Sequence, residues 1–273
     1  MPKRAKSSPK HAVNWPGRVQ AMRRTTVLHF FASVAAAFPL ATATGSSAQL
    51  PPERHADESS AAMLSRQASL HESRGDYEAA IAGYDRAIEA QPRDWQLYLL
   101  RGSARFKAGR IEASIEDFDQ VVALDPSQDP YLWQRGISYY YAGRFADCRG
   151  QFERHRLVNP NDVENAVWHL LCVAVVDGLE VAQAAMLPVG PDPRRPMKEI
   201  DALFRGEGRV AEVEAAVREE GSGARFYADL YLGLYYELVG EDEKAAASIE
   251  RAAALPNRGY MVEVARVHRG LSP

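Results

Sequence analysis

The chain has 273 residues, a length typical of one or two domains, and the composition of a globular protein, with 46% apolar and 25% charged residues. Its net charge is −3, but residues 1–48 hold seven basic and no acidic residues, whereas residues 49–273 hold 26 basic and 36 acidic ones. Binding to nucleic-acid phosphates requires a concentrated basic face, and the acidic composition of residues 49–273 excludes this kind of binding.

Residues 1–48 are predicted to be a targeting segment. Arg23 and Arg24 precede an apolar run over 27–41, which is followed by small residues ending at Ala48. A charged start, an apolar centre and a small-x-Ala cleavage site are typical of a secretory signal peptide, and the run is short for a membrane span. We therefore expect an exported protein, periplasmic or secreted, with no stable membrane span after cleavage. A signal-anchored form and a bipartite organelle signal are the alternatives.

Residues 49–60 are expected to form a flexible lead-in, and the sequence after them repeats with a period of 34 residues. Glycines, prolines, small residues and aromatic residues each recur with this spacing. Each of the three recurring glycines lies 17 residues before one of the recurring prolines. The recurring positions are Gly75, Gly109 and Gly143; Pro92, Pro126 and Pro160; Ala68, Gly102 and Gly136; and Tyr84, Phe118 and Phe152.

These residue types at this spacing predict stacked helical hairpins. Glycine supplies the backbone freedom needed where one helix ends and the chain reverses, and proline cannot continue a helix. The small residues let two antiparallel helices approach closely, and the aromatic residues fill the gap to the following helix. Because one hairpin cannot bury its apolar stripe alone, neighbouring hairpins must stack.

In these residues the chain resembles the tetratricopeptide repeat family, and the resemblance covers residues 61–160. It implies an all-α fold, a right-handed superhelical solenoid of helical hairpins, and a role as a protein-interaction scaffold. The chain departs from the family pattern where polar residues replace apolar ones and where two residues replace an alanine. These positions are Gln67, Arg101 and Arg135, then Ser114 and Cys148.

The remaining sequence is less regular. Residues 161–223 are predicted to form a degenerate helical-repeat section with a break from Pro188 to Pro193. Residues 224–257 are expected to form a further repeat unit, and residues 258–273 a capping helix and tail. With its export signal the chain also loosely resembles periplasmic tetratricopeptide adaptor lipoproteins, which hold envelope proteins together. No lipid-attachment cysteine follows the cleavage site, however. Within 161–223 we expect helices near 163–176, 179–187, 196–205 and 208–220.

The search for catalytic spacing finds one pair of residues. His169 and Cys172 are three residues apart, so on a helix they share a face, as metal ligands or a Cys–His nucleophile pair would. No second compact pair accompanies them, and a packed cysteine beside a hydrogen-bonded histidine is the preferred interpretation. We therefore expect no enzyme, no cofactor and no metal site. A metal-binding or Cys/His-based catalytic site at His169 and Cys172 stays as an alternative. A disulfide between Cys148 and Cys172 is a separate expectation for an exported protein.

A partner protein or peptide is expected to bind in the concave groove, which the first helix of each hairpin builds. Aromatic residues give a large contact area at a low ordering cost, so those of the third repeat are preferred. The proline-arginine segment 192–196 is either an irregular connector or a basic clamp on an acidic protein. The candidate partner-binding residues are Leu99, Phe106, Lys107, Trp133, Tyr140, Tyr141, Arg194 and Arg195.

A self-assembling structural protein is the second alternative. Tyr227, Tyr231 and Tyr235 are spaced by four residues along one predicted helix and would share a face. The sequence defines neither the identity of the partner nor the oligomeric state.

Overall fold

The structure, a computed structural model, describes residues 52–256 and 259–271. The predicted targeting segment, residues 1–48, lies outside the described residues. Within the two described ranges every regular element is a helix. In chain order these are α2 (Pro52–Ser73), α3 (Tyr77–Ala90), α4 (Trp95–Lys107), α5 (Ile111–Leu124), η2 (Pro126–Tyr131), α6 (Trp133–Tyr141), α7 (Phe145–His155), α8 (Val163–Asp177), α9 (Leu179–Ala184), α10 (Met197–Arg205), α11 (Val210–Ala216), α12 (Ser222–Val239), α13 (Asp242–Ala254) and α14 (Tyr260–Leu271).

The first helix is longer than the repeat pattern indicates. Helix α2 begins at Pro52, so most of the segment 49–60, predicted to be a flexible lead-in, is helical. Proline fits the first turn of a helix, where its missing N–H group has no helical partner to lose. The glutamate and alanine residues that follow it are good helix formers. None of the helices in the described ranges is long and apolar enough to cross a membrane.

Five hairpins in the described ranges turn in the same way. After α2, α4, α6, α10 and α12, a glycine adopts a left-handed conformation, with φ of 81° at Gly75 and 77° at Gly240. The next residue donates its backbone N–H to the carbonyl five positions earlier, as Asp76 does to His71 at 3.0 Å. This is the Schellman ending of a helix, in which glycine is favoured because it has no Cβ to strain. The glycine period therefore marks the hairpin turns.

The small residues of the repeat lie against its aromatic residues. A Cβ added at Gly136, on α6, would lie 2.8 Å from the Phe152 ring on α7, and one at Gly102 would lie 2.9 Å from the Phe118 ring. Phe118 also packs with Leu132, at the entrance to the next hairpin. The aromatic residues therefore fill space both within a hairpin and between hairpins.

Two departures from the family pattern are ion-pair networks. Arg101, on α4, pairs with Asp85 on α3 at 2.6 Å and with Asp117 on α5 at 2.7 Å. Arg135, one repeat later on α6, pairs with Asp119 on α5. A largely buried guanidinium must be paired to offset its desolvation, and here its partners lie on neighbouring helices. These arginines therefore replace apolar packing with charged contacts between successive hairpins.

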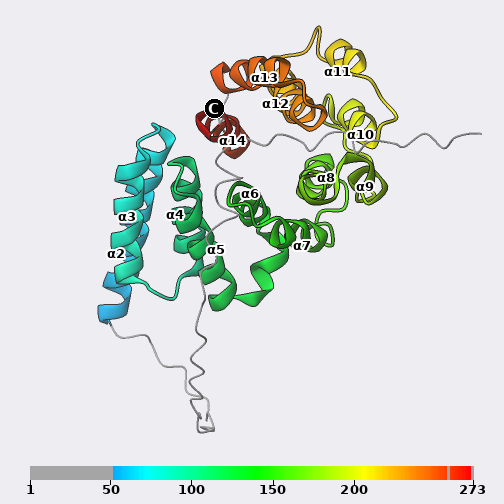
Figure 1. Cartoon of the computed structure of the whole chain (residues 1–273). Helices are drawn as coiled ribbons and strands as arrows, with labels where there is room; N and C mark the ends of the chain where they lie inside the picture. The colour runs from blue at the N-terminus through cyan, green and yellow to red at the C-terminus, as the bar shows by residue number, and fades with distance from the viewer. Residues whose placement is uncertain (1–51, 257–258, 272–273) are drawn as a thin grey trace, which may run out of the picture.

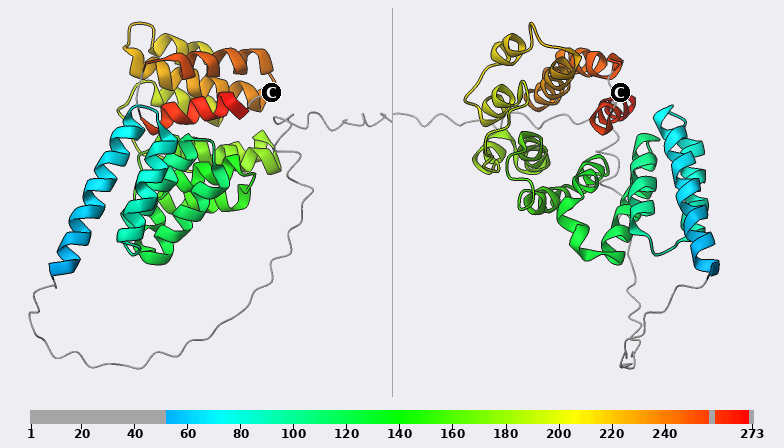
Figure 2. Two further views of the ribbon diagram at one scale, coloured as in Figure 1. Left: turned by 90° about the vertical axis from the view of Figure 1, so that its left-hand side faces the viewer. Right: turned by 180° about the vertical axis from the view of Figure 1, so that it is seen from behind.

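The hairpins follow one another around an arc, and the last helix returns to the beginning of it (Figure 1). Helix α14 packs against α13 and also against α4, so elements far apart in the sequence lie side by side. Figure 2 shows the same meeting of α14 with the early helices from two other directions. The sequence predicts α14 as a cap on the last hairpin and does not predict its contact with α4.

Candidate functional site

Aromatic side chains of α4 and α6 meet α14 on the inside of the arc, and the Trp168 ring of α8 lies beside them. Tyr260, the first residue of α14, stacks on Phe106 with ring centroids 5.2 Å apart and meets Trp133 edge-on at 4.9 Å. The Tyr141 ring lies 5.7 Å from Phe106, and its hydroxyl lies 3.0 Å from Nδ1 of His268. The Trp168 ring on α8 lies 6.3 Å from Tyr141. We call this group of rings the inner aromatic face; its residues are Phe106, Trp133, Tyr141, Trp168 and Tyr260, of which Phe106 and Trp168 are fully buried.

Four of the predicted partner-binding residues contact α14. Three belong to the inner aromatic face, and the fourth, Lys107, holds its ammonium 5.5 Å above the Tyr260 ring. Tyr140 is only 2% exposed and packs edge-on against Trp168, so it is a core residue in this structure. Leu99 packs with Phe118 in the core between hairpins. The chain's own last helix therefore covers much of the groove in which a partner is expected.

In the predicted basic clamp, segment 192–196, the charge of Arg194 is compensated by carboxylates of the same chain. Arg194, in the connector between α9 and α10, pairs with Asp162 at 2.6 Å, Glu164 at 2.5 Å and Asp192 at 2.6 Å. Arg195 has a side chain 60% exposed to solvent and stands outside this cluster. Arg194 therefore fastens the connector to the start of α8. We call Asp162, Glu164, Asp192 and Arg194 the acidic cluster.

One member of the acidic cluster has a strongly shifted pKa. Glu164 accepts hydrogen bonds from the Tyr231 hydroxyl at 2.6 Å and from Arg194 at 2.5 Å. Burial and the charge of Asp162 nevertheless raise the pKa of Glu164 to about 7. At Asp192 the hydrogen bonds from Arg194 and from the backbone N–H of Val163 outweigh burial and lower the pKa, whereas at Glu164 burial and the charge of Asp162 outweigh the hydrogen bonds.

This shift predicts a pH-dependent stability that a Glu164→Gln variant should lack. Between pH 4.5 and about 7 the carboxyl is protonated in the folded chain and ionised in the unfolded chain. The folded state then binds more protons, so the free energy of unfolding falls as pH rises. Relative to the variant, we expect the wild type to lose about 2 kcal/mol between pH 5 and pH 7.5, measured by urea unfolding. A difference between the two proteins that does not change with pH would contradict this assignment.

A cavity of about 540 Å³ lies between the acidic cluster and the inner aromatic face. Residues of α6, α7, α8, α12 and α14 line it, together with Arg194 of the connector. This volume is typical of sites that hold a small ligand or one large side chain of a partner. Its aromatic lining comprises Trp133, Phe152, Trp168, Phe226, Tyr227 and Tyr260, and its charged lining comprises Asp162, Glu164 and Arg194.

The sequence prediction finds this cavity only in part. Trp133 and Arg194 were both expected to contact a partner, and both line it. Tyr227 and Tyr260 were missed as lining residues because they belong to helices distant in sequence, and no period connects these helices to the first repeats.

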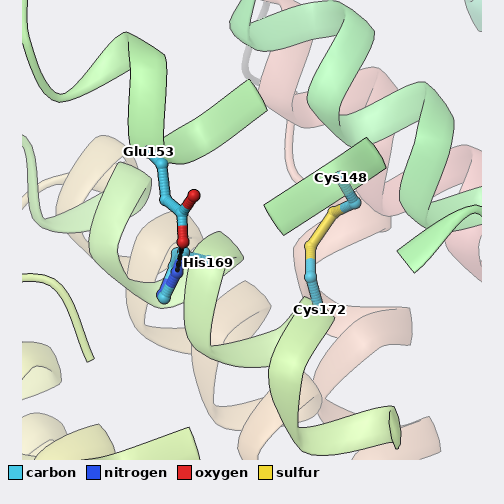
Figure 3. The surroundings of a disulfide bond; sticks show 4 residues. All are labelled: Cys148, Glu153, His169 and Cys172. Atoms are coloured by element: carbon cyan, nitrogen blue, oxygen red, sulfur yellow. Dashed lines mark ion pairs between the residues drawn. A yellow bond between two sulfur atoms is a disulfide. The ribbon is translucent and has the colours of Figure 1, made fainter. Parts of the chain in front are cut away.

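The His169 and Cys172 pair has no free thiol in this structure. Cys172 on α8 forms the expected disulfide with Cys148 on α7, with Cα atoms 6.0 Å apart (Figure 3). His169 is 1% exposed, and its Nε2 lies 3.5 Å from a carboxylate oxygen of Glu153. Burial lowers the pKa of His169 despite this carboxylate. In the part of the chain that the structure describes, no three His, Cys, Asp or Glu residues are grouped to hold a metal ion.

The tyrosines proposed for self-assembly lie inside the chain. Tyr231 is fully buried, and its ring stacks on Tyr227 with centroids 6.5 Å apart. Tyr235 meets Phe204 of α10 edge-on at 5.6 Å. On this face of α12, Tyr231 is therefore engaged by α8 and Tyr235 by α10, whereas Tyr227 is half-buried and lines the cavity.

Comparison with known proteins agrees with this architecture. Residues 65–129 match the family model described as tetratricopeptide repeat. A tetratricopeptide repeat protein from Parabacteroides merdae aligns over 77% of this chain and 83% of its own, with 16% identity and a TM-score of 0.50. TTC0263 from Thermus thermophilus, a TPR protein, covers 77% of this chain and 98% of its own at 16% identity, with a TM-score of 0.44. YrrB, a TPR protein with an unusual peptide-binding site, covers 78% and 96% at 17% identity, with a TM-score of 0.43. None of the curated proteins matches the sequence. The likeness concerns the fold.

Proposed function

We propose that the chain is a non-catalytic interaction scaffold that holds a segment of a partner protein in the cavity inside its arc, because residues 65–129 match the tetratricopeptide repeat model and the chain folds into stacked helical hairpins. The inner cavity carries this proposal. Six aromatic side chains line it, and they come from helices of separate hairpins. Aromatic residues in desolvated pockets supply most of the binding energy in many protein interfaces. A partner side chain inserted here would be surrounded by rings already held in place by core packing.

Helix α14 is part of the proposed site. Tyr260, Met261 and Val262 form one wall of the cavity, and Tyr260 is held by Phe106 and Trp133. The proposed site therefore differs from an open concave groove, because it requires the contact between α14 and the early hairpins. A partner would reach the cavity beside α14 and not in its place.

We also propose that the protein acts after export. The predicted signal in residues 1–48 supports this, and so does the disulfide between Cys148 and Cys172, since structural disulfides persist in oxidising compartments. N-terminal mass spectrometry of the protein from its native cells would test export. A mature chain beginning at Gln49 is the expected result, and a chain that keeps residues 1–48 would argue against cleavage.

Site-specific photo-crosslinking in native cells tests the scaffold function. A photoreactive phenylalanine replaces Tyr227, which lines the cavity, or Tyr131, which is 55% exposed on η2 and does not line it. Both changes replace one aromatic ring with another, so the two variants are matched. We expect a discrete crosslinked partner from position 227 that position 131 does not yield. The same products at both positions, or none at position 227, would contradict the proposal, and a product of two copies of this chain would favour self-assembly.

A further inference from the structure

The polar wall of the cavity carries excess negative charge. Asp162 and Glu164 line the cavity, and Asp192, with a side chain 3% exposed, contacts Arg194 beside them. The one guanidinium of Arg194 is bonded to all three carboxylates. The acidic cluster is therefore short of positive charge when its carboxylates are ionised, and a second cation would be attracted to it.

Two side chains in the lining, Asn165 and His155, each have a polar atom without a hydrogen-bond partner. The Asn165 amide donates to the Phe152 carbonyl at 3.2 Å, which leaves Oδ1 as the acceptor end. His155 donates from Nδ1 to the Pro130 carbonyl at 2.8 Å, so the lone pair of the neutral ring is on Nε2.

Neither Asn165 Oδ1 nor His155 Nε2 has a hydrogen-bond partner among the residues described, although Asn165 is 4% and His155 5% exposed. Trp168 Nε1 is an unpartnered donor in the same lining. Unpaired buried polar groups are costly, and acceptors predominate here. Because these atoms are almost wholly covered by their neighbours, they act on a ligand through their partial charges and do not bond to it directly.

The aromatic walls also favour a cation. A cation over the face of an aromatic ring is attracted by the negative charge of that face, and this attraction grows when the site excludes water. One such contact is already present in the lining, where Arg194 lies 5.8 Å from the Tyr227 ring centre, and Lys107, outside the lining, lies 5.5 Å from the ring centre of Tyr260. Rings and carboxylates together are the groups that recognise an organic cation.

We propose that the cavity binds a basic side chain, lysine or arginine, of the partner segment. This inference rests on the proposed scaffold function and names the chemistry of the partner. It reverses the sign expected from the sequence, in which Arg194 and Arg195 would hold an acidic protein. The ammonium or guanidinium group would meet Asp162 and Glu164, and its aliphatic stem would lie along Trp133 and Tyr260.

Retention of defined peptide pools on the immobilised wild-type protein tests this proposal at pH 8. Four pools of nonapeptides are random except for a fixed central residue, which is lysine, arginine, norleucine or glutamate. Their termini are acetylated and amidated, so that no other fixed charge is present. We expect the lysine and arginine pools to be retained about tenfold more than the norleucine pool, because norleucine keeps the apolar stem and lacks the charge. The glutamate pool should be retained least.

A double variant tests whether the preference for the lysine and arginine pools depends on the carboxylates of the cavity. Asp162→Asn with Glu164→Gln removes both lining carboxylates, and asparagine still caps the start of α8. This variant should retain the lysine and norleucine pools to within about twofold of each other. Asp177→Asn with Glu180→Gln is the matched control, because it makes the same change in net charge at exposed carboxylates outside the cavity. The control should keep the wild-type preference.

The outcomes separate the two proposals. Equal retention of the lysine, arginine and norleucine pools by the wild type would overturn the basic-ligand inference and leave the scaffold function standing. Failure of the wild type to retain any pool would overturn both. A preference that is lost equally in the control variant would place the basic residue outside the cavity. If the cavity variant proves unfolded by circular dichroism, the wild-type comparison of lysine with norleucine still decides the inference.

Discussion

Replacing Phe106 with alanine is expected to lower the free energy of unfolding by about 3–5 kcal/mol. The Phe106 side chain is fully buried at the end of α4, where it stacks on Tyr260 of α14 and lies beside Tyr141 of α6. Truncation would remove its burial and leave a cavity at the contact that joins the last helix to the early hairpins. The loss should therefore include part of the energy that holds α14 in place.

A double-mutant cycle with Tyr260→Ala isolates that part. Stacked aromatic pairs contribute beyond their buried area, so we expect a coupling of about 1 kcal/mol between the two substitutions in urea unfolding. Phe118→Ala is the matched control, because Phe118 is also fully buried but packs between hairpins with Val121 and Leu132. It should cost a similar amount and show no coupling to Tyr260→Ala. Additive effects of Phe106→Ala and Tyr260→Ala would mean that α14 is not held by this contact.

Removal of the disulfide should have a comparable effect. Cys148 and Cys172 are separated by 24 residues, and a cross-link that closes a loop of this length stabilises the folded chain by about 3.5 kcal/mol through the entropy of the unfolded state. We therefore expect the Cys148→Ala/Cys172→Ala variant to unfold at a correspondingly lower urea concentration than the oxidised wild type. Wild type with its disulfide reduced should behave like the variant.

The earlier repeats supply controls for this experiment. At the equivalent positions one repeat before, the Ser114 and Ser138 hydroxyls form a hydrogen bond of 2.9 Å, and both side chains are buried. Two repeats before, Ala80 and Ala104 belong to one buried cluster. A pair of alanines or a pair of serines therefore fits this site. The Cys148→Ser/Cys172→Ser variant removes the covalent link and leaves two hydroxyl groups that can form the hydrogen bond seen between Ser114 and Ser138. Equal stability of the oxidised wild type and both variants would show that the disulfide contributes nothing.

The solenoid could be predicted because its determinants are local in sequence. A glycine such as Gly75 defines a helix end, and a proline such as Pro92 lies just past the end of α3, each through contacts within a few residues. Recurrence of these positions every 34 residues then predicts the stacked hairpins. The helix bounds of α8 and α12 follow from the same local signals.

The closure of the arc could not be predicted, because it depends on the angles of many successive hairpins. The connector between α9 and α10 interrupts the repeat period. Its sequence does not predict the orientation of α10 relative to α9. The ion pairs of Arg194 show the same limit. Its partners Glu164 and Asp162 lie 30 and 32 residues away in sequence, so its role as an anchor was visible only in the structure.

The candidate site was predicted only in part, for a geometric reason. Adjacent residues on a helix point about 100° apart, so Tyr140 and Tyr141 point in different directions, although both rings meet Trp168. The structure buries Tyr140 and turns Tyr141 towards His268 of α14. Sequence spacing identified the right helix, and only packing decided which of its tyrosines meets α14.

Binding of a peptide to a variant with a filled cavity tests the proposed scaffold site most directly. Gly223 lines the cavity at the start of α12, and a Cβ added there meets no atom within 4 Å. Gly223→Phe therefore adds bulk to the cavity and removes no side-chain contact. Gly221→Phe is the matched control, since a Cβ at Gly221 also meets nothing within 4 Å and this residue does not line the cavity.

The measurement is isothermal titration of one peptide, chosen from those that the wild-type protein retains, into the wild type and both variants. If the partner segment occupies the cavity, Gly223→Phe should weaken binding at least about tenfold, and Gly221→Phe should bind within about twofold of the wild type. Equal affinity for all three proteins would contradict the proposal that the cavity is the binding site.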